Sequence, residues 1–292
     1  MLTRRSLIAA PLALAAQTSG LELCIHQTTL LGAGFRRSLE AIAKAGIKLV
    51  EVIPAHVEEF FKKDGLPAAR RLLADLGLRA VSSGSVRGLF EPHPGRDKAI
   101  EQFKAYLPLA AELGVDRLVC PCGSAERHTL DDYKRGVDNA RQLGDIVKQY
   151  RVVAMLEFMR GSTFIGTLPS ALDLTRQAAH TNVKPMLDFY HFWAGLSKLE
   201  DLELIRNGEL HHVHFQDVPR MPRELLDNST RDIPGDGVAP LHHMLKALPR
   251  KAYRGPLSVE LFYPRLQNGD PYAVCIEIRR KSETVMRAAG VL

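Results

Sequence analysis

Four ionisable side chains stand near the ends of apolar segments in the second half of the sequence: Glu157 in "MLEFM", Asp188 in "MLDFY", His214 in "HHVHF" and Glu260 in "LSVEL". A charge inside an apolar strand is costly unless it is paired or binds a metal. One such residue alone is more often a paired structural group. Three carboxylates and one imidazole from four successive strands, all at the same height, instead predict a site for Mn²⁺, Mg²⁺, Co²⁺ or Zn²⁺.

The stretch "HHVHFQDVPR", residues 211–220, carries three histidines in ten positions. Strand alternation places His212 and His214 on one face, and His211 and Asp217 on the opposite face. We predict that His214 is the metal ligand and that His212, deeper on the same face, either packs beside it or supports it from behind. Asp217 is expected to order the following loop or to contact a substrate.

Eight short apolar runs, most of them followed by a polar turn and a stretch with helical spacing, must position these residues. The runs cover residues 21–27, 47–54, 78–84, 116–123, 151–159, 183–190, 210–217 and 255–262. Eight strand-then-helix units predict an α/β fold, a single-domain (β/α)8 barrel over 21–292, whose strand ends meet at one rim. A doubly wound open sheet is the alternative, but no Gly-rich phosphate motif follows any run.

Helical spacing is clearest over 35–46 and 103–114, each of which ends at a glycine, and over 130–150, which has an apolar stripe. The one long connection covers 218–239. Because it follows the seventh run, it is expected to lie over the C-terminal mouth of the barrel, where the active sites of such folds lie.

The first twenty residues differ from the rest of the chain. The segment "TRRSLIAAPLALAAQ" begins with two arginines, continues with an apolar stretch, and contains the small-residue pattern Ala13-Leu14-Ala15. This pattern predicts a twin-arginine-type signal peptide over 1–20, with an apolar stretch too short to cross a bilayer. The mature chain is therefore expected to be periplasmic or otherwise exported.

The overall composition is typical of a soluble globular protein. The 292 residues are 46% hydrophobic and 25% charged, and the net charge of +6 is spread without a long basic run. This distribution argues against nucleic-acid binding, and no segment predicts a stable membrane span. Four cysteines do not predict a disulfide framework. The pair Cys120 and Cys122 could bind a soft metal, but two buried small residues are the simpler interpretation.

The segments "MLEFM", "MLDFYHFW", "HHVHFQDVPR" and "LSVELF" resemble the xylose isomerase-like TIM barrels. This superfamily contains sugar isomerases and epimerases, inosose dehydratases, hydroxypyruvate isomerases and zinc apurinic endonucleases. As a fold, the resemblance covers most of 21–290, and its specific motifs lie between 151 and 262. It implies a metal-dependent enzyme that acts on a small carbohydrate, with Mn²⁺ as the first expectation for the metal.

In the ketose 3-epimerases of this superfamily, a Glu of the fifth strand and a Glu of the eighth strand bind the metal and form the acid/base pair. The resemblance implies these roles for Glu157 and Glu260. It also implies substrate contacts by His191 and Arg220, which follow the sixth-strand and seventh-strand ligands by three and six residues. The chemistry would be deprotonation beside a carbonyl, a cis-enediolate, and reprotonation.

The four ligands do not choose among epimerisation, aldose–ketose isomerisation and dehydration. An inosose-type dehydratase acting on a keto-sugar or keto-cyclitol is therefore the alternative function. A non-catalytic carbohydrate-binding barrel is a second alternative, against which the presence of both glutamates argues. Glu51, at the end of the second run, is a further substrate-contact candidate, with a salt bridge inside the barrel as its structural alternative.

Three further expectations concern partners. The third and fourth runs end in "SSG" and "CPCG", without the histidines that the zinc endonucleases of the superfamily use, so the resemblance does not extend to nucleic-acid cleavage. The exported location implies a free sugar, keto-sugar or glycoside as substrate. A homo-oligomer is compatible with the sequence.

Overall fold

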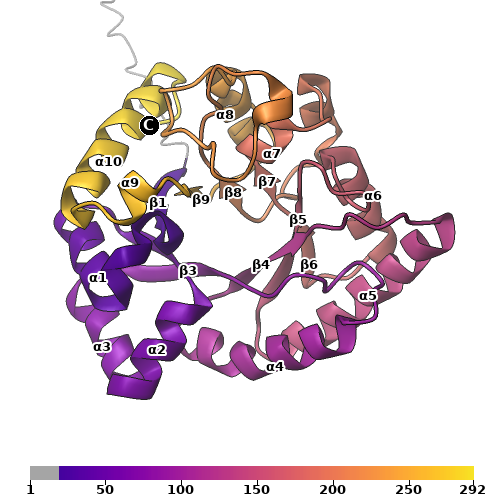
Figure 1. Cartoon of the computed structure of the whole chain (residues 1–292), viewed down its shortest axis with the longest axis horizontal. Coiled ribbons are helices and arrows are strands. Elements are labelled where there is room, and N and C mark those ends of the chain that lie inside the picture. Colours follow the sequence, from indigo (N-terminus) through magenta and orange to yellow (C-terminus); the bar gives the residue numbers. More distant parts are fainter. Residues whose placement is uncertain (1–19) are drawn as a thin grey trace, which may run out of the picture.

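The computed structural model describes residues 20–292, whose strands form a nearly closed parallel barrel surrounded by helices (Figure 1). The order of the strands in the sheet is β6-β5-β4-β3-β2-β1-β9-β8-β7. Their bounds are β1 (Glu22–His26), β2 (Leu49–Val52), β3 (Arg79–Gly84), β4 (Arg117–Cys122), β5 (Val153–Phe158), β6 (Val183–Pro185), β7 (Leu187–Asp188), β8 (Val213–His214) and β9 (Pro256–Val259). The predicted single-domain (β/α)8 barrel is confirmed, and each of the eight predicted runs contains a strand.

The sixth predicted run forms two short strands, β6 and β7, instead of one. Pro185 carries no N–H, so it cannot donate to the ladder, and the assigned strand ends there. The next two residues bond to the neighbouring runs on either side. The Met186 amide donates to Leu156 O in β5 at 3.1 Å, and the Leu187 amide donates to His212 O, just before β8, at 3.1 Å. Met186 thus joins β6 and β7, the two edge strands of the sheet. This connection places the ends of β5 and β8 on the same rim of the barrel.

The helices form an outer ring around the strands (Figure 1). The predicted helices over 35–46, 103–114 and 130–150 are found as α1, α4 and α5, each of which ends two residues earlier than predicted. The helix bounds are α1 (Gly34–Lys44), α2 (Pro54–Asp64), α3 (Leu66–Asp75), α4 (Arg96–Glu112), α5 (Leu130–Lys148), α6 (Leu168–Ala178), α7 (Phe189–Ala194), α8 (Leu241–Arg250), α9 (Pro264–Gln267) and α10 (Pro271–Ala288), with short 3-10 helices η1 (Gln27–Ala33), η2 (Leu199–Leu204) and η3 (Arg223–Leu225).

Two small apolar clusters fill the barrel below its C-terminal rim, apart from the large core between strands and helices. Met155 and Met186 pack together in one of them, and Cys24 and Leu49 pack together in the other. Each of these residues lies two positions before an ionisable residue of the same strand run. Since strand residues alternate between faces, the apolar layer predicts that the ionisable side chains also point into the barrel.

The four cysteines are buried and free, and Cys120 and Cys122 belong to the large core. The packing interpretation of this pair therefore holds. Within residues 20–292, none of the helices has both the length and the apolar character required to cross a bilayer. The predicted signal peptide lies outside the described residues, apart from Gly20.

Candidate metal and catalytic site

The C-terminal ends of neighbouring strands bring the four predicted metal ligands together. Glu157 lies in β5, Asp188 ends β7, His214 ends β8, and Glu260 directly follows β9. Parallel register pairs Asp188 with His214. One ligand atom of each of the four residues lies within 4.8 Å of those of the others. We call these four residues the rim cluster.

The distances in the rim cluster fit a single divalent ion. Nδ1 of His214 lies 3.2 Å from an oxygen of Glu157, and 3.4 Å from an oxygen of Asp188 and from an oxygen of Glu260. Ligand atoms bound at about 2.1 Å to a tetrahedral ion lie about 3.4 Å from one another. Three carboxylate oxygens and one imidazole nitrogen are a donor set that Mn²⁺, Mg²⁺, Co²⁺ and Zn²⁺ accept.

The protein gives the two glutamates of the rim cluster different proton affinities. Burial raises the pKa of Glu157 to about 7, although a hydrogen bond with His214 opposes the shift. Burial would also raise the pKa of Glu260, but the charges of Arg231 and His214 outweigh it and lower that pKa. Groups with opposed environments of this kind are suited to separate acid and base roles.

A buried arginine, Arg231, forms part of the site and was missed by sequence reasoning. Its guanidinium is 2% exposed, donates through Nη1 to Asp188 at 3.1 Å, and also donates to Glu260. The guanidinium lies 5.1 Å from the ring centre of Tyr190 and 4.9 Å from that of Phe262. A usable signal was present, because this arginine directly precedes the "DIPGDG" segment in the long loop.

Arg220, the predicted substrate-binding arginine, forms no hydrogen bond or ion pair with the rim cluster in the described structure. Arg220 is exposed at the beginning of the long loop, and its side chain makes no hydrogen bond or ion pair with the part of the chain that the structure describes. The spacing of six residues from His214 placed it near the site along the chain. The path of the loop brings Arg231 into the cluster instead, eleven residues later.

The long loop is ordered by the carboxylate of Asp217, which is 2% exposed. This carboxylate accepts hydrogen bonds from the amides of Val218 at 2.8 Å, Gly235 at 3.0 Å and Ala239 at 2.9 Å. The backbone of Asp217 also pairs with Asp232, the neighbour of the buried arginine. Of the two predicted roles for Asp217, loop ordering is the one that these contacts support, and it holds Arg231 over the rim.

His191 is fully buried beside the rim cluster, at the start of α7. Its Nδ1 accepts the amide hydrogen of Arg160 at 3.1 Å, so in the neutral ring the proton sits on Nε2. Burial lowers the pKa of His191 to about 4, which keeps the ring neutral at physiological pH. Nε2 lies 3.0 Å from Nη2 of Arg231, so two nitrogens that both carry N–H groups lie side by side in the site.

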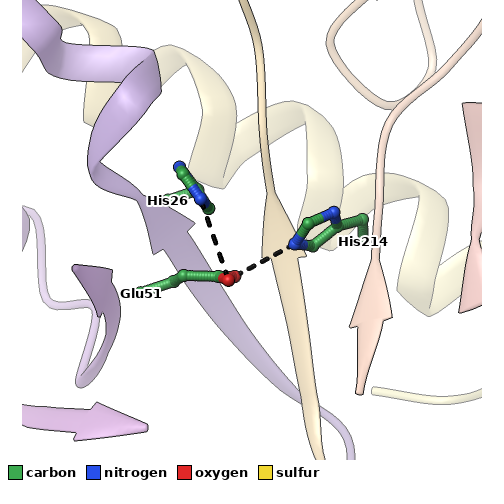
Figure 2. Close-up of side chains that lie close together, drawn as sticks. All are labelled: His26, Glu51 and His214. Atoms are coloured by element: carbon green, nitrogen blue, oxygen red, sulfur yellow. Dashed lines mark hydrogen bonds and ion pairs between the residues drawn. The ribbon is translucent and has the colours of Figure 1, made fainter. Parts of the chain in front are cut away.

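Glu51 lies at the end of β2, fully buried, and contacts three histidines rather than the open rim. Its carboxylate lies 2.9 Å from Nε2 of His212, 3.2 Å from Nε2 of His214 and 3.7 Å from Nε2 of His26. Figure 2 shows the carboxylate between His26 and His214. These contacts support the salt-bridge alternative predicted for Glu51. They also give His212 a hydrogen-bond partner, and of its two predicted roles this contact favours support of the ligand.

Comparison with known proteins identifies a family and several relatives. The family model of the xylose isomerase-like TIM barrels matches residues 39–281. An inosose isomerase of Halalkalibacterium halodurans is 28% identical over 254 residues, which cover 84% of this chain and 89% of that protein. A 3-dehydroshikimate dehydratase of Pseudomonas aeruginosa is 29% identical over 80% of this chain, which corresponds to 37% of that longer protein.

Among solved structures, the crystal structure of the IOLI protein with a zinc atom superposes with a TM-score of 0.85. It is 22% identical in sequence, and the superposition covers 92% of this chain and 99% of the other. This likeness independently supports the barrel fold.

The affinity of the rim cluster for a divalent ion should rise steeply with pH. In the metal-free protein, Glu157 has a pKa of about 7. Burial would lower the pKa of His214, but the carboxylates of Glu51 and Glu260 outweigh it and hold that pKa well above its usual range. Both groups must lose a proton to bind a cation, so Mn²⁺ uptake should release about two protons below pH 7 and about one above it.

Titration calorimetry in buffers of different ionisation enthalpy measures this number between pH 6 and pH 8. A Glu157→Gln variant should release about one proton fewer than the wild type at pH 6, because its amide does not titrate. Equal proton release at pH 6 and pH 8 in the wild type would contradict the assignment of Glu157.

Proposed function

The chain is an enzyme of the xylose isomerase-like TIM barrel family, and we propose that it is a divalent-metal-dependent sugar isomerase or epimerase. The observation that carries this proposal is the rim cluster itself, in which Glu157 and Glu260 flank Nδ1 of His214 together with Asp188. The similarity to an inosose isomerase over 84% of the chain supports the same reaction class.

The metal ligands in this proposal are the four residues of the rim cluster. A bound divalent ion would polarise a substrate carbonyl and acidify the neighbouring C–H group. Mn²⁺ is our first choice because carboxylate oxygens dominate the donor set. The zinc atom in the crystal structure of the IOLI protein supports a divalent ion but not its identity.

Glu157 and Glu260 form the proposed acid/base pair. The Glu260 carboxylate, stabilised by Arg231, accepts the proton from the carbon next to the carbonyl. Glu157, on the other side of His214, is the proposed acid that delivers a proton to the substrate. Return to the opposite face of the same carbon inverts that centre, whereas return to the adjacent carbon isomerises the sugar.

His191 and Arg231 are the proposed substrate-binding residues, and Arg231 replaces Arg220 in this role. The N–H groups of His191 Nε2 and Arg231 Nη2 face each other across 3.0 Å and cannot bond to each other. A substrate oxygen to one side of the two nitrogens would accept a hydrogen bond from each of them. Nε of Arg231 is also buried without a partner in the described structure, which leaves another donor for a substrate.

A dehydratase is the second candidate function, because the chain is also similar to a 3-dehydroshikimate dehydratase. The same carboxylate pair serves both reactions, since each begins with removal of a proton next to a carbonyl. Elimination then needs a leaving hydroxyl on the next carbon and an acid that protonates it, a role that Glu157 would fill in this alternative.

Replacement of either glutamate of the pair by glutamine should greatly lower turnover while the fold remains. Loss of a general acid or base lowers kcat by roughly 10²- to 10⁴-fold. The measurement is turnover of a panel of ketoses, aldoses and keto-cyclitols with Mn²⁺, followed by mass spectrometry. An isomerase or epimerase leaves the substrate mass unchanged, whereas loss of water would establish the dehydratase alternative.

The matched control is Glu91→Gln, which also replaces a buried carboxylate, but one that contacts Cys122 outside the rim cluster. It should keep its turnover. If Glu157→Gln and Glu260→Gln were as active as this control, the acid/base assignment would be wrong.

The two arginines should differ sharply when each is replaced by glutamine. Arg231→Gln removes a buried charged donor, and such hydrogen bonds contribute about 1.5–3 kcal/mol. We expect kcat/KM to fall by roughly 10- to 100-fold, mainly through KM. Arg220→Gln changes an exposed loop residue and should leave kcat/KM nearly unchanged. Steady-state kinetics of both variants measure this difference. A larger loss of kcat/KM in Arg220→Gln than in Arg231→Gln would show that Arg220 is the substrate-binding arginine, as its spacing from His214 predicted.

Export by the N-terminal twenty residues remains our proposal, and it favours a free sugar, keto-sugar or glycoside over a sugar phosphate as the substrate. Residues 1–25 fused to a folded reporter protein should direct that reporter out of the cytoplasm, and the Arg4→Lys, Arg5→Lys double variant should not. A reporter that stays in the cytoplasm with the intact leader would contradict export and remove the reason to prefer a substrate without phosphate.

A further inference from the structure

A carboxylate that does not face the open rim lies directly behind the histidine of the rim cluster. Glu51 is fully buried, and β-sheet register pairs it with His26 on the neighbouring strand. Its Oε2 lies 2.9 Å from Nε2 of His212 and 3.2 Å from Nε2 of His214. Its other oxygen, Oε1, has no hydrogen-bond partner in the described structure. The acid/base roles proposed above do not use Glu51.

One interpretation of this arrangement is a second metal site. Ligand atoms of His26, Glu51 and His214 lie within 4.8 Å of one another. Figure 2 shows these three side chains pointing toward one another. However, His214 belongs to both groups, and it has only two ring nitrogens. Its Nδ1 already faces the three carboxylates of the rim cluster. Two cations could share this ring only if it lost both protons, which a neutral imidazole does not do.

The other interpretation follows from the positions of the protons. If Nδ1 of His214 binds a metal, the single proton of the neutral ring is on Nε2, and this N–H points at Oε2 of Glu51. His212 presents its Nε2 to the same oxygen. A carboxylate can accept both bonds, because each oxygen has two lone pairs. Carboxylates placed behind a metal-bound histidine in this way set the tautomer and the direction of the ring.

The remaining histidine, His26, contacts both Glu51 and Glu260 of the rim cluster. Its Nδ1 accepts the amide hydrogen of Thr28 at 3.1 Å, so its proton is on Nε2. That nitrogen lies 3.7 Å from Oε1 of Glu51 and 3.6 Å from Oε1 of Glu260. Glu51 therefore contacts one ring that belongs to the rim cluster, His214, and one ring that contacts the cluster through Glu260, His26.

We propose that Glu51 is the positioning residue of the metal site: its carboxylate holds the Nε2–H of His214 and thereby directs the Nδ1 lone pair at the metal. This inference rests on the proposed function, because it requires that the rim cluster bind a divalent ion. Glu51 touches neither the ion nor the substrate. Its contribution is to the affinity for the metal, which can be measured without any substrate.

The test compares Mn²⁺ binding by the wild type, Glu51→Gln and the matched control Glu91→Gln. Competition with a chelator gives the dissociation constant, and elemental analysis gives the number of ions per chain. The wild type should bind one ion. Loss of a partner behind a metal-bound histidine weakens binding by roughly 10- to 100-fold, so we expect this change in Glu51→Gln. Glu91→Gln also replaces a buried carboxylate and should keep the wild-type affinity.

A second measurement needs no variant and so does not depend on how Glu51→Gln folds. Nitrogen NMR of the Zn²⁺-loaded wild type should show the proton of His214 on Nε2 and the metal on Nδ1. A proton on Nδ1 would overturn the proposal.

The other outcomes separate the two proposals. Two ions per wild-type chain, of which Glu51→Gln loses one and keeps the other at full affinity, would establish the second metal site and overturn the positioning role. Equal affinity in the wild type and Glu51→Gln would overturn the positioning role alone. A wild type that binds no divalent ion would overturn both this inference and the metal-dependent function.

Discussion

The imidazole of His214 lies between carboxylates on both of its edges, and the arrangement of the barrel rim depends on this contact. Nδ1 faces Glu157, Asp188 and Glu260, while Nε2 faces Glu51. Four acidic groups at this distance repel one another strongly in a buried, weakly polar environment. The cluster is stable only because cationic groups lie inside it.

In the metal-free protein those cations are His214 itself and Arg231. The carboxylates hold the pKa of His214 well above its usual range although burial would lower it, and the guanidinium of Arg231 bonds to Asp188 and Glu260. Burial also leaves a proton on Glu157 near neutral pH. A divalent ion would take over the charge balance, displace protons, and leave the guanidinium free to bind substrate oxygens. The same charges thus stabilise the fold and prepare the site for a metal.

The long loop contributes to this charge balance, because it places Arg231 beside Asp188 and Glu260 at the rim. The Asp217 carboxylate explains how a connection of this length is ordered, because it accepts hydrogen bonds from backbone amides at both ends of the loop. A Cβ atom at Gly237 would collide with Val218 O and with the Asp217 side chain, so this turn requires glycine. The residues that distinguish an isomerase from a dehydratase should lie in such loops, since the rim cluster serves both reactions.

The sequence by itself determined the barrel and the four residues that meet in the rim cluster. Eight alternating strand and helix units leave few topologies, and a parallel barrel brings all strand ends to one rim, so Glu157, Asp188, His214 and Glu260 could be placed together from their positions in the runs. Only the tertiary structure decided which arginine enters the site and what Glu51 contacts. Arg220 and Arg231 lie on the same loop, and its path depends on hydrogen bonds to Asp217 that no spacing rule encodes. Glu51 and His214 lie on strands that are not neighbours, and their contact exists only because the barrel curves back on itself.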